Sequence, residues 1–206
     1  MDDTKVRETK SLLREKHGLD VNDNIVNKLL QCHSSLKLNH GTFSEELPEQ
    51  VMALLFLNGD EKVLEIGGNI GRNSLIISSI IDSNNLVVVE SDKDIAKQLD
   101  ENRVANNFNF KIVDKALSKH KLIQKGWTCI KSDIVHPGYK EVDIISYSDL
   151  KSQYNIVFDT LIIDCEGAFS QILLEMVEIL ENIKTIIIEN DFYNYDHKKY
   201  VDSVLK

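Results

Sequence analysis

Two acidic residues near a glycine-rich loop carry the strongest chemical signal in this sequence. Glu65 ends an apolar run and is followed by the loop Gly67-Gly68-Asn69-Ile70-Gly71. Glycine lets a backbone turn tightly and approach a ligand closely. Glu90 ends the next apolar run, near the spacing of about 20 residues at which a carboxylate binds the ribose hydroxyls of an adenosine. The pattern predicts a strand, a loop and a helix at 72–81 that hold a nucleotide-like cofactor.

The glycine spacing indicates which cofactor this is. Dinucleotide folds use G-x-G-x-x-G, and Asn69 and Arg72 occupy its second and third glycine positions here. S-adenosylmethionine (SAM) has no pyrophosphate and carries a sulfonium and an ammonium group, which acidic strand ends suit electrostatically. The acids available are Glu65, Glu90, Asp164 and Glu166. We therefore predict SAM. An NAD(P)-dependent oxidoreductase and a tight turn without a ligand are the alternatives.

The composition and net charge indicate which classes of binding partner are disfavoured. The 206 residues carry a formal net charge of −9, which repels nucleic acid, and 42% hydrophobic residues is ordinary for a globular protein. Apolar stretches are shorter than the ~20 residues that span a bilayer, and the charged start at 1–5 lacks the features of a secretory signal. We expect a soluble, cytoplasmic protein that binds neither nucleic acid nor membranes. Nothing in the sequence predicts an oligomeric state.

The pattern of apolar residues along the chain changes near residue 58. Residues 1–57 have apolar residues at helical spacings and predict an N-terminal helical cap. In 58–206, β-branched runs alternate with helical stretches, which predicts a Rossmann-like α/β domain, a mostly parallel sheet with helices on both faces. The runs are 61–66, 85–90, 110–117, 158–164 and 184–190. Residues 121–148, interrupted by glycine and proline, predict a small antiparallel β insertion.

Several motifs in this order resemble the FkbM-like methyltransferases, a branch of the class I SAM-dependent enzymes, over about 61–190. The loop at 65–71 is similar to that family's acid-x-Gly-Ala-Asn-x-Gly loop, Asn69 included. Glu90 resembles its ribose-binding acid, and Asp164-Cys165-Glu166-Gly167-Ala168 looks like its Asp-Val-Glu-Gly-Ala motif. The spacing of Leu99, Asn102 and Asn107 and the segment Ala116-Leu117-Ser118 also match. The resemblance implies a class I methyltransferase sheet and a cofactor site formed by Glu65, Gly67, Gly68, Asn69, Gly71, Glu90, Ser91, Ala116, Leu117 and Asp164.

The sequence also departs from this family. The family often has a lysine where Ile162 stands and an acid where Phe169 stands. The two strands that usually end the class I fold are missing after residue 190, so we expect either a short sheet or a truncated sequence. These departures motivate a second hypothesis, a cofactor-binding or regulatory subunit without catalysis.

Transfer of a methyl group to a hydroxyl requires an aligned acceptor and a base. Asp164 and Glu166 follow the fourth predicted strand and are our candidate catalytic residues, with His136 or His197 as alternatives if their loops fold over the cleft. Glu166 could instead stabilise a helix N-terminus. Asp164, Glu189 and Asn190, with Asp191 beside them, resemble the magnesium site of catechol-type O-methyltransferases, so a Mg²⁺ ion is a further possibility. The predicted reaction is O-methylation of a small hydroxylated acceptor such as a sugar or glycan, on which Trp127, Tyr139, Tyr193 or Tyr195 could stack.

Overall fold

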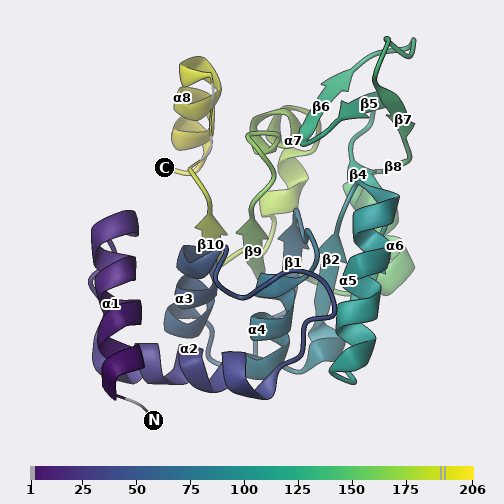
Figure 1. Ribbon diagram of the computed structural model, residues 1–206. Coiled ribbons are helices and arrows are strands. Elements are labelled where there is room, and N and C mark those ends of the chain that lie inside the picture. Colours follow the sequence, from purple (N-terminus) through teal and green to yellow (C-terminus); the bar gives the residue numbers. More distant parts are fainter. Residues whose placement is uncertain (1–2, 191, 193) are drawn as a thin grey trace.

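The computed structural model describes residues 3–190, 192 and 194–206, and Figure 1 shows their arrangement. The central strands are β1 (Val63–Ile66), β2 (Leu86–Val89), β3 (Lys111–Val113), β9 (Thr160–Ile163) and β10 (Thr185–Ile188). The shorter strands are β4 (Ala116–Leu117), β5 (Leu122–Lys125), β6 (Thr128–Lys131), β7 (Lys140–Val142) and β8 (Ile144–Ile145). The α-helices are α1 (Asp3–His17), α2 (Asp23–Ser35), α3 (Leu47–Phe56), α4 (Arg72–Ile80), α5 (Lys93–Ala105), α6 (Tyr147–Tyr154), α7 (Phe169–Glu175) and α8 (Tyr195–Val204). Two short 3₁₀ helices, η1 (Ser83–Asn85) and η2 (Val177–Leu180), complete the described elements.

The five central strands form one sheet in the order β10-β9-β1-β2-β3, and every neighbouring pair is parallel. The chain runs outward from β1 to β3 and then returns to the other side of β1 with β9. The carboxyl ends of β1 and β9 therefore flank a topological switch point, the place where open α/β sheets bind ligands. This arrangement confirms the predicted Rossmann-like fold.

Alternation along the strands divides the core into two apolar layers. Leu64, Ile66 and Val89 face the layer that contains α6, α7 and η2. Val63 and Val88 face the opposite layer, which contains α3, α4 and α5. Successive side chains of a strand point to opposite faces, and the helices that cover both faces bury every residue of β1, β2 and β9. Figure 1 shows α4 and α5 in front of the sheet and α6 and α7 behind it.

The first 57 residues contain three helices. α1, α2 and α3 share a separate apolar cluster that includes Leu13, Val26 and Val51. α3 also packs against α4, and Ala53 belongs to the layer that covers the sheet. The division of the chain at 57 and 58 stays a prediction. No helix in the described ranges is long and apolar enough to cross a bilayer.

The small antiparallel sheet is present, with strand order β6-β5-β7. Its predicted end at residue 148 is wrong. β8 pairs in parallel with β4, where the amide groups of Ala116 and Ser118 donate to the carbonyl groups of Asp143 and Ile145. α6 then begins at Tyr147. The predicted strand 110–117 is accordingly divided into β3, which belongs to the central sheet, and β4, which leaves it. In the described part of the chain after β10 there is a helix, α8, and no strand.

Candidate active site

A cavity of about 730 Å³ opens above the carboxyl ends of β1, β2 and β9, within the size range of small-molecule sites. Its walls are the β1–α4 loop, the end of β2, β4, the β5–β6 hairpin and the β9–α7 loop. Glu46, Glu189 and His197 complete the wall from outside these segments. The cavity therefore lies at the switch point of the sheet.

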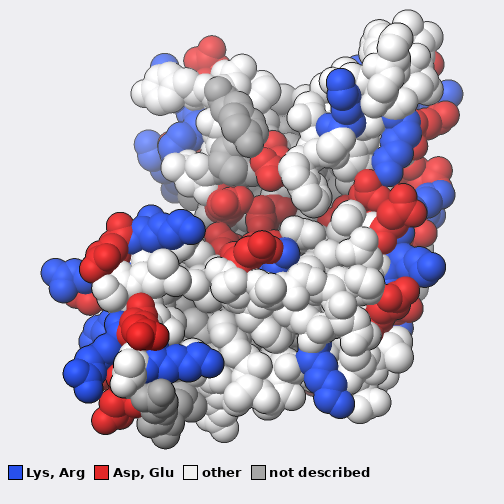
Figure 2. All heavy atoms as spheres, in the orientation of Figure 1, with Lys and Arg blue, Asp and Glu red and all other residues white. Residues whose placement is uncertain are grey.

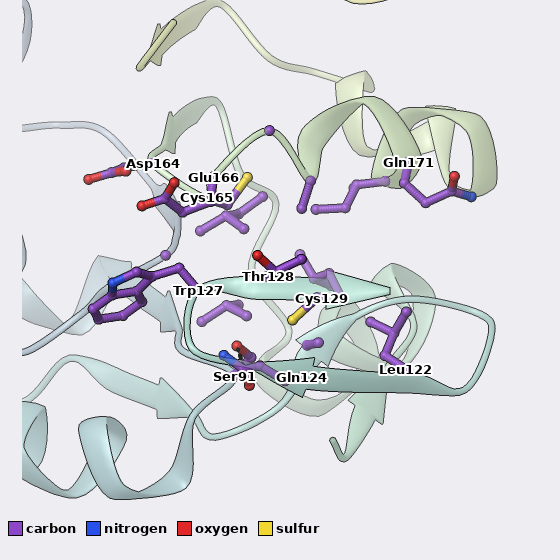
Figure 3. A pocket seen from close by; sticks show the side chains of 18 of the residues that line it. Ser91, Leu122, Gln124, Trp127, Thr128, Cys129, Asp164, Cys165, Glu166 and Gln171 are labelled. Carbon is purple, nitrogen blue, oxygen red and sulfur yellow. Dashed lines mark hydrogen bonds between the residues drawn. The ribbon is translucent and has the colours of Figure 1, made fainter. Parts of the chain in front are cut away.

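The β5–β6 hairpin covers one side of the cavity. Trp127 lies at the hairpin turn with 55% of its surface exposed, and it lines the cavity together with Thr128 and Cys129. Figure 3 shows Trp127 and Thr128 across the open space from Asp164 and Glu166, with Cys129 turned toward Ser91 and Gln124. The inserted antiparallel sheet thus places an aromatic ring opposite two carboxyl groups.

The cavity is strongly acidic. Its lining includes five carboxylate residues, Glu46, Glu90, Asp164, Glu166 and Glu189. Lys131 is the lysine in the lining, and Figure 2 shows acidic side chains gathered in the hollow above the sheet. Such a lining favours a ligand that carries positive charge.

Glu90 stands at the end of β2 with 5% of its surface exposed, and it lines the cavity. Its carboxylate oxygens accept hydrogen bonds from the backbone amides of Asn69, at 2.9 Å, and Asp92, at 2.8 Å. Burial raises the pKa of Glu90, and these amide hydrogen bonds oppose the rise. Glu90 is therefore a fixed acceptor that also holds the β1–α4 loop in place.

Gly67 lets this loop pass against the β9–α7 loop. Its φ is +89°, and a Cβ atom there would lie 1.5 Å from the carbonyl oxygen of Asp164. The amide of Asp164 donates to the carbonyl of Ile66 at 2.9 Å. Only a residue without a side chain allows this approach, so the glycine is required by contact between the two loops.

Gly68 and Gly71 have a packing role instead of lining the cavity. A Cβ atom on Gly68 would lie 2.2 Å from a methyl group of Val88, and one on Gly71 would lie 2.4 Å from a methyl group of Leu99. These two glycines let α5 and β2 pack against the start of α4. The glycine pattern alone does not distinguish this role from ligand contact.

Glu65 is also outside the cavity lining, although the sequence predicts a cofactor contact. Alternation in β1 turns its side chain toward α4, where 3% of the residue is exposed. Its carboxyl group accepts hydrogen bonds from the Ser74 hydroxyl at 2.5 Å and the Asn73 amide at 3.2 Å. Burial raises the pKa of Glu65 to about 8. A protonated Glu65 can donate to the buried Asn73 side-chain oxygen, which has no partner among the described residues, if that amide is turned over.

This buried carboxyl group predicts a dependence of stability on pH. Between the usual pKa of 4.5 and the folded value of about 8, the folded state keeps a proton that the unfolded state has lost. The contribution of Glu65 to the free energy of unfolding is therefore greatest at low pH, and it is lost as the pH rises from 4.5 to about 8. We expect the free energy of unfolding to fall between pH 6 and pH 8 by about 2 kcal/mol less in Glu65→Gln than in wild type. Urea denaturation of both proteins at pH 6 and at pH 8 measures this difference.

Glu61→Gln is the matched control for this prediction, because hydrogen bonds from Asn58 and Gly59 lower the pKa of Glu61 and keep its titration below pH 6. The control variant should keep the wild-type pH dependence. An equal pH dependence in wild type and Glu65→Gln would show that Glu65 is ionised in the folded protein.

Asp164 and Glu189 meet at the floor of the cavity. Both residues line the cavity, and Glu189 is close enough to contribute to the raised pKa of Asp164. Burial, Glu189 and the negative charges of Glu46 and Glu49 raise the pKa of Asp164 far above its usual range. The sequence motifs after β9 and β10 therefore lie together, as expected for neighbouring parallel strands.

The predicted magnesium site is not supported. Asn190 is exposed and does not line the cavity, and Asp191 lies outside the described residues. No group of three or more His, Cys, Asp or Glu residues in the described ranges is arranged to hold a metal ion.

The remaining predicted residues are divided between the cavity and the surface. Ser91, Ala116, Leu117, Asn69 and Glu166 line the cavity, as does His197 on α8. The N-cap of α7 is Ala168, and the backbone of Glu166 is in the left-handed region with φ +53°, so its role at the helix N-terminus stays a prediction. His136, Tyr139 and Tyr195 do not line the cavity, and Tyr193 lies outside the described residues.

Sequence reasoning missed Glu46 and the buried side chain of Gln124. Glu46 is the N-cap of α3, a position at which sequence signals indicate a helix start and nothing more. Gln124 is on β5 and donates to the carbonyl of Gly126 at 3.0 Å, so it stabilises the hairpin turn beside the cavity. Glu46 reaches the site through its contacts with Asn69 and Arg72, which lie in a distant segment.

Comparison with known proteins gives a weak likeness at the level of the fold. No protein-family model and no curated protein matches the sequence. Three solved structures illustrate the similarity. An O-methyltransferase from Bacillus cereus in complex with SAH has 14% identity, covers 100% of this chain and 86% of its own, and gives a TM-score of 0.48. The O-methyltransferase TomG from Streptomyces achromogenes in complex with SAM has 11% identity, coverages of 98% and 84%, and a TM-score of 0.47.

A third similar structure is a precorrin 8W decarboxylase from Methanobacterium thermoautotrophicum, with 10% identity, coverages of 84% and 77%, and a TM-score of 0.47. Its name describes a different reaction from those of the other two. Likeness at these values does not identify an activity, and the fold assignment rests on the strand order and pairing described above.

Proposed function

We propose that this chain binds SAM and transfers its methyl group to a hydroxyl group of a small acceptor such as a sugar or glycan. The observation that carries the proposal is Glu90, a fixed carboxylate that borders an acidic cavity one strand away from the Gly67 loop. A carboxylate at this place suits the two hydroxyl groups of a ribose. The acidic lining also suits a cation better than a pyrophosphate, which argues against a dinucleotide.

The acidic lining of the cavity suits the positive charge of this cofactor, and the backbone at Gly67 leaves room for it. Asn69, Ser91, Ala116 and Leu117 line it beside Glu90, and Gly67 keeps the adjoining backbone free of side-chain atoms. When bound, the cofactor would supply a methyl group attached to a positively charged sulfur. The proposed cofactor residues of this chain are therefore Gly67, Asn69, Glu90, Ser91, Ala116, Leu117 and Asp164, while Glu65, Gly68 and Gly71 support the loop.

Asp164 and Glu166 are the proposed groups that receive or position the acceptor. Burial and the neighbouring acids raise the pKa of Asp164, so Asp164 accepts the proton of a hydroxyl only after it has lost its own. A cation held in the cavity favours that loss by lowering the pKa of Asp164. Trp127 provides an exposed ring opposite Asp164 on which a sugar could stack.

The proposal also includes a protein family, a cellular location and a class of acceptor. The FkbM-like resemblance supports a class I methyltransferase. We propose a cytoplasmic protein, and the net charge of −9 supports a small-molecule acceptor over nucleic acid.

Binding without catalysis is the second candidate function, and one observation favours it. Ile162 and Phe169, which occupy positions where the resembled family has a lysine and an acid, are 2% and 1% exposed in the apolar layers. Neither contributes a functional group to the cavity. A protein that senses or carries the cofactor would keep the binding site and lack these groups.

Calorimetric titration with S-adenosylhomocysteine (SAH) and with NAD⁺ tests the proposal. We expect micromolar binding of SAH and no binding of NAD⁺. Transfer of tritium from methyl-labelled SAM to a panel of sugars and glycans then separates an enzyme from a binding protein. Binding of NAD⁺ without SAH would support the oxidoreductase alternative and contradict the proposal.

A further inference from the structure

Glu46 enters the cavity wall from the segment that precedes α3. It has a left-handed backbone, with φ +56°, and 18% of its side chain is exposed. Burial raises the pKa of this carboxyl group, and Arg72 opposes the rise. A largely buried carboxylate in this position is stabilised by any cation that binds beside it.

The two oxygens of Glu46 have different surroundings. Oε1 accepts hydrogen bonds from the Arg72 guanidinium at 2.7 Å and from the Asn69 side-chain amide at 2.9 Å. None of the described residues donates a hydrogen bond to Oε2. Arg72 also donates to the carbonyl of Thr42 at 2.9 Å and forms an ion pair with Glu45, so its position is fixed by several contacts. The carboxylate is therefore held by one oxygen while the other is available.

Asn69 connects Glu46 to the proposed ribose site. Its backbone amide donates to Glu90, and its side-chain amide donates to Glu46. Glu46 and Asp164 line the same cavity, and the negative charge of Glu46 raises the pKa of Asp164. Hydrogen bonds thus link Glu90, Asn69 and Glu46 in this order, and Asp164 lines the same cavity. A ligand whose ribose lies at Glu90 would extend its other end toward Glu46.

We propose that Glu46 binds the ammonium group at the amino-acid end of SAM and SAH, an inference that rests on the proposed function. The available oxygen is a charged acceptor, and an ammonium group has three donors. Asp164 also lines the cavity, but burial and the neighbouring Glu189 raise its pKa, so it attracts a cation less than an ionised carboxylate would. Arg72 divides its charge between Glu45 and Glu46, which leaves the region around Glu46 negative.

The experiment measures binding of two ligands to two proteins by calorimetry. The ligands are SAH and its desamino analogue, which keeps the adenosine, the thioether and the carboxylate but has no ammonium group. Wild type should bind SAH about 10-fold or more tightly than the analogue, because a hydrogen bond to a charged group is lost. Glu46→Gln keeps an oxygen that can accept from Arg72 and Asn69. It should bind SAH and the analogue with affinities within about twofold of each other, and its affinity for the analogue should equal that of wild type.

Glu45→Gln is the matched control, since Glu45 pairs with the same arginine but does not line the cavity. It should keep the full wild-type preference for SAH. Equal binding of SAH and the analogue by wild type would overturn the role of Glu46, and this arm does not depend on the folding of any variant. A preference for SAH that persists in a folded Glu46→Gln protein would also overturn it. Failure of wild type to bind either ligand would instead remove the proposed function, and the inference with it.

Discussion

Replacing Glu90 by alanine is expected to weaken the binding of SAH by about 100-fold, because ribose hydroxyls that donate to a carboxylate lose a charged acceptor. The loss has a second source in this structure. Without the carboxylate, the backbone amide of Asn69 loses its acceptor, and the β1–α4 loop is held less firmly. Calorimetric titration of the folded variant with SAH measures the change in affinity.

Two controls separate recognition of ribose from support of the loop. Asp92→Ala removes the side chain that caps α5, at a cost of about 1 kcal/mol in stability, and leaves the backbone amide that donates to Glu90. It should bind SAH within about twofold of wild type. Wild type should also prefer adenosine to 2′-deoxyadenosine, and Glu90→Ala should lose that preference. If the variant kept both its affinity and its preference, Glu90 would not be the ribose-binding residue.

Replacing Gly67 by alanine is expected to lower the free energy of unfolding by more than about 4 kcal/mol, a loss that few single substitutions reach. The new Cβ atom would lie 1.5 Å from the backbone carbonyl oxygen of Asp164, and neither loop can move without breaking contacts between β1 and β9. The positive φ adds strain. Urea denaturation followed by circular dichroism measures the loss, and expression mainly as unfolded protein would agree with it.

Gly18→Ala is the control for the contribution of φ alone. Gly18 has φ +68°, and a Cβ atom there would have no neighbour within 4 Å. We expect this variant to lose only about 1 kcal/mol. Equal losses in the two variants would mean that the backbone angle, and not contact between the loops, explains the need for glycine at Gly67.

The sequence was sufficient for features that depend on neighbouring residues. The parallel sheet follows from β-branched runs that alternate with helices, and the position of Glu90 follows from the length of one strand-helix-strand unit. The contact of Asp164 with Glu189 also follows in outline, because both residues end adjacent parallel strands. Each of these features is encoded within a short window of the chain.

Other features depend on packing between distant segments. Glu65 has the residue type of a ligand-binding acid, but alternation in β1 turns it beneath α4 toward Ser74. Gly68 and Gly71 serve the packing of Val88 and Leu99, which no local pattern reveals. Glu46 reaches the cavity because Arg72, 26 positions later in the chain, holds it there. The antiparallel insertion was predicted, but its place over the cavity depends on the path of β4 and β8.

A crystal structure of this chain with SAH tests the central claim most directly. The account predicts that SAH occupies the cavity with both ribose hydroxyl groups within hydrogen-bond distance of the Glu90 carboxylate and the thioether sulfur beside the Gly67 loop. SAH bound with its ribose away from Glu90, or bound outside this cavity, would contradict the account.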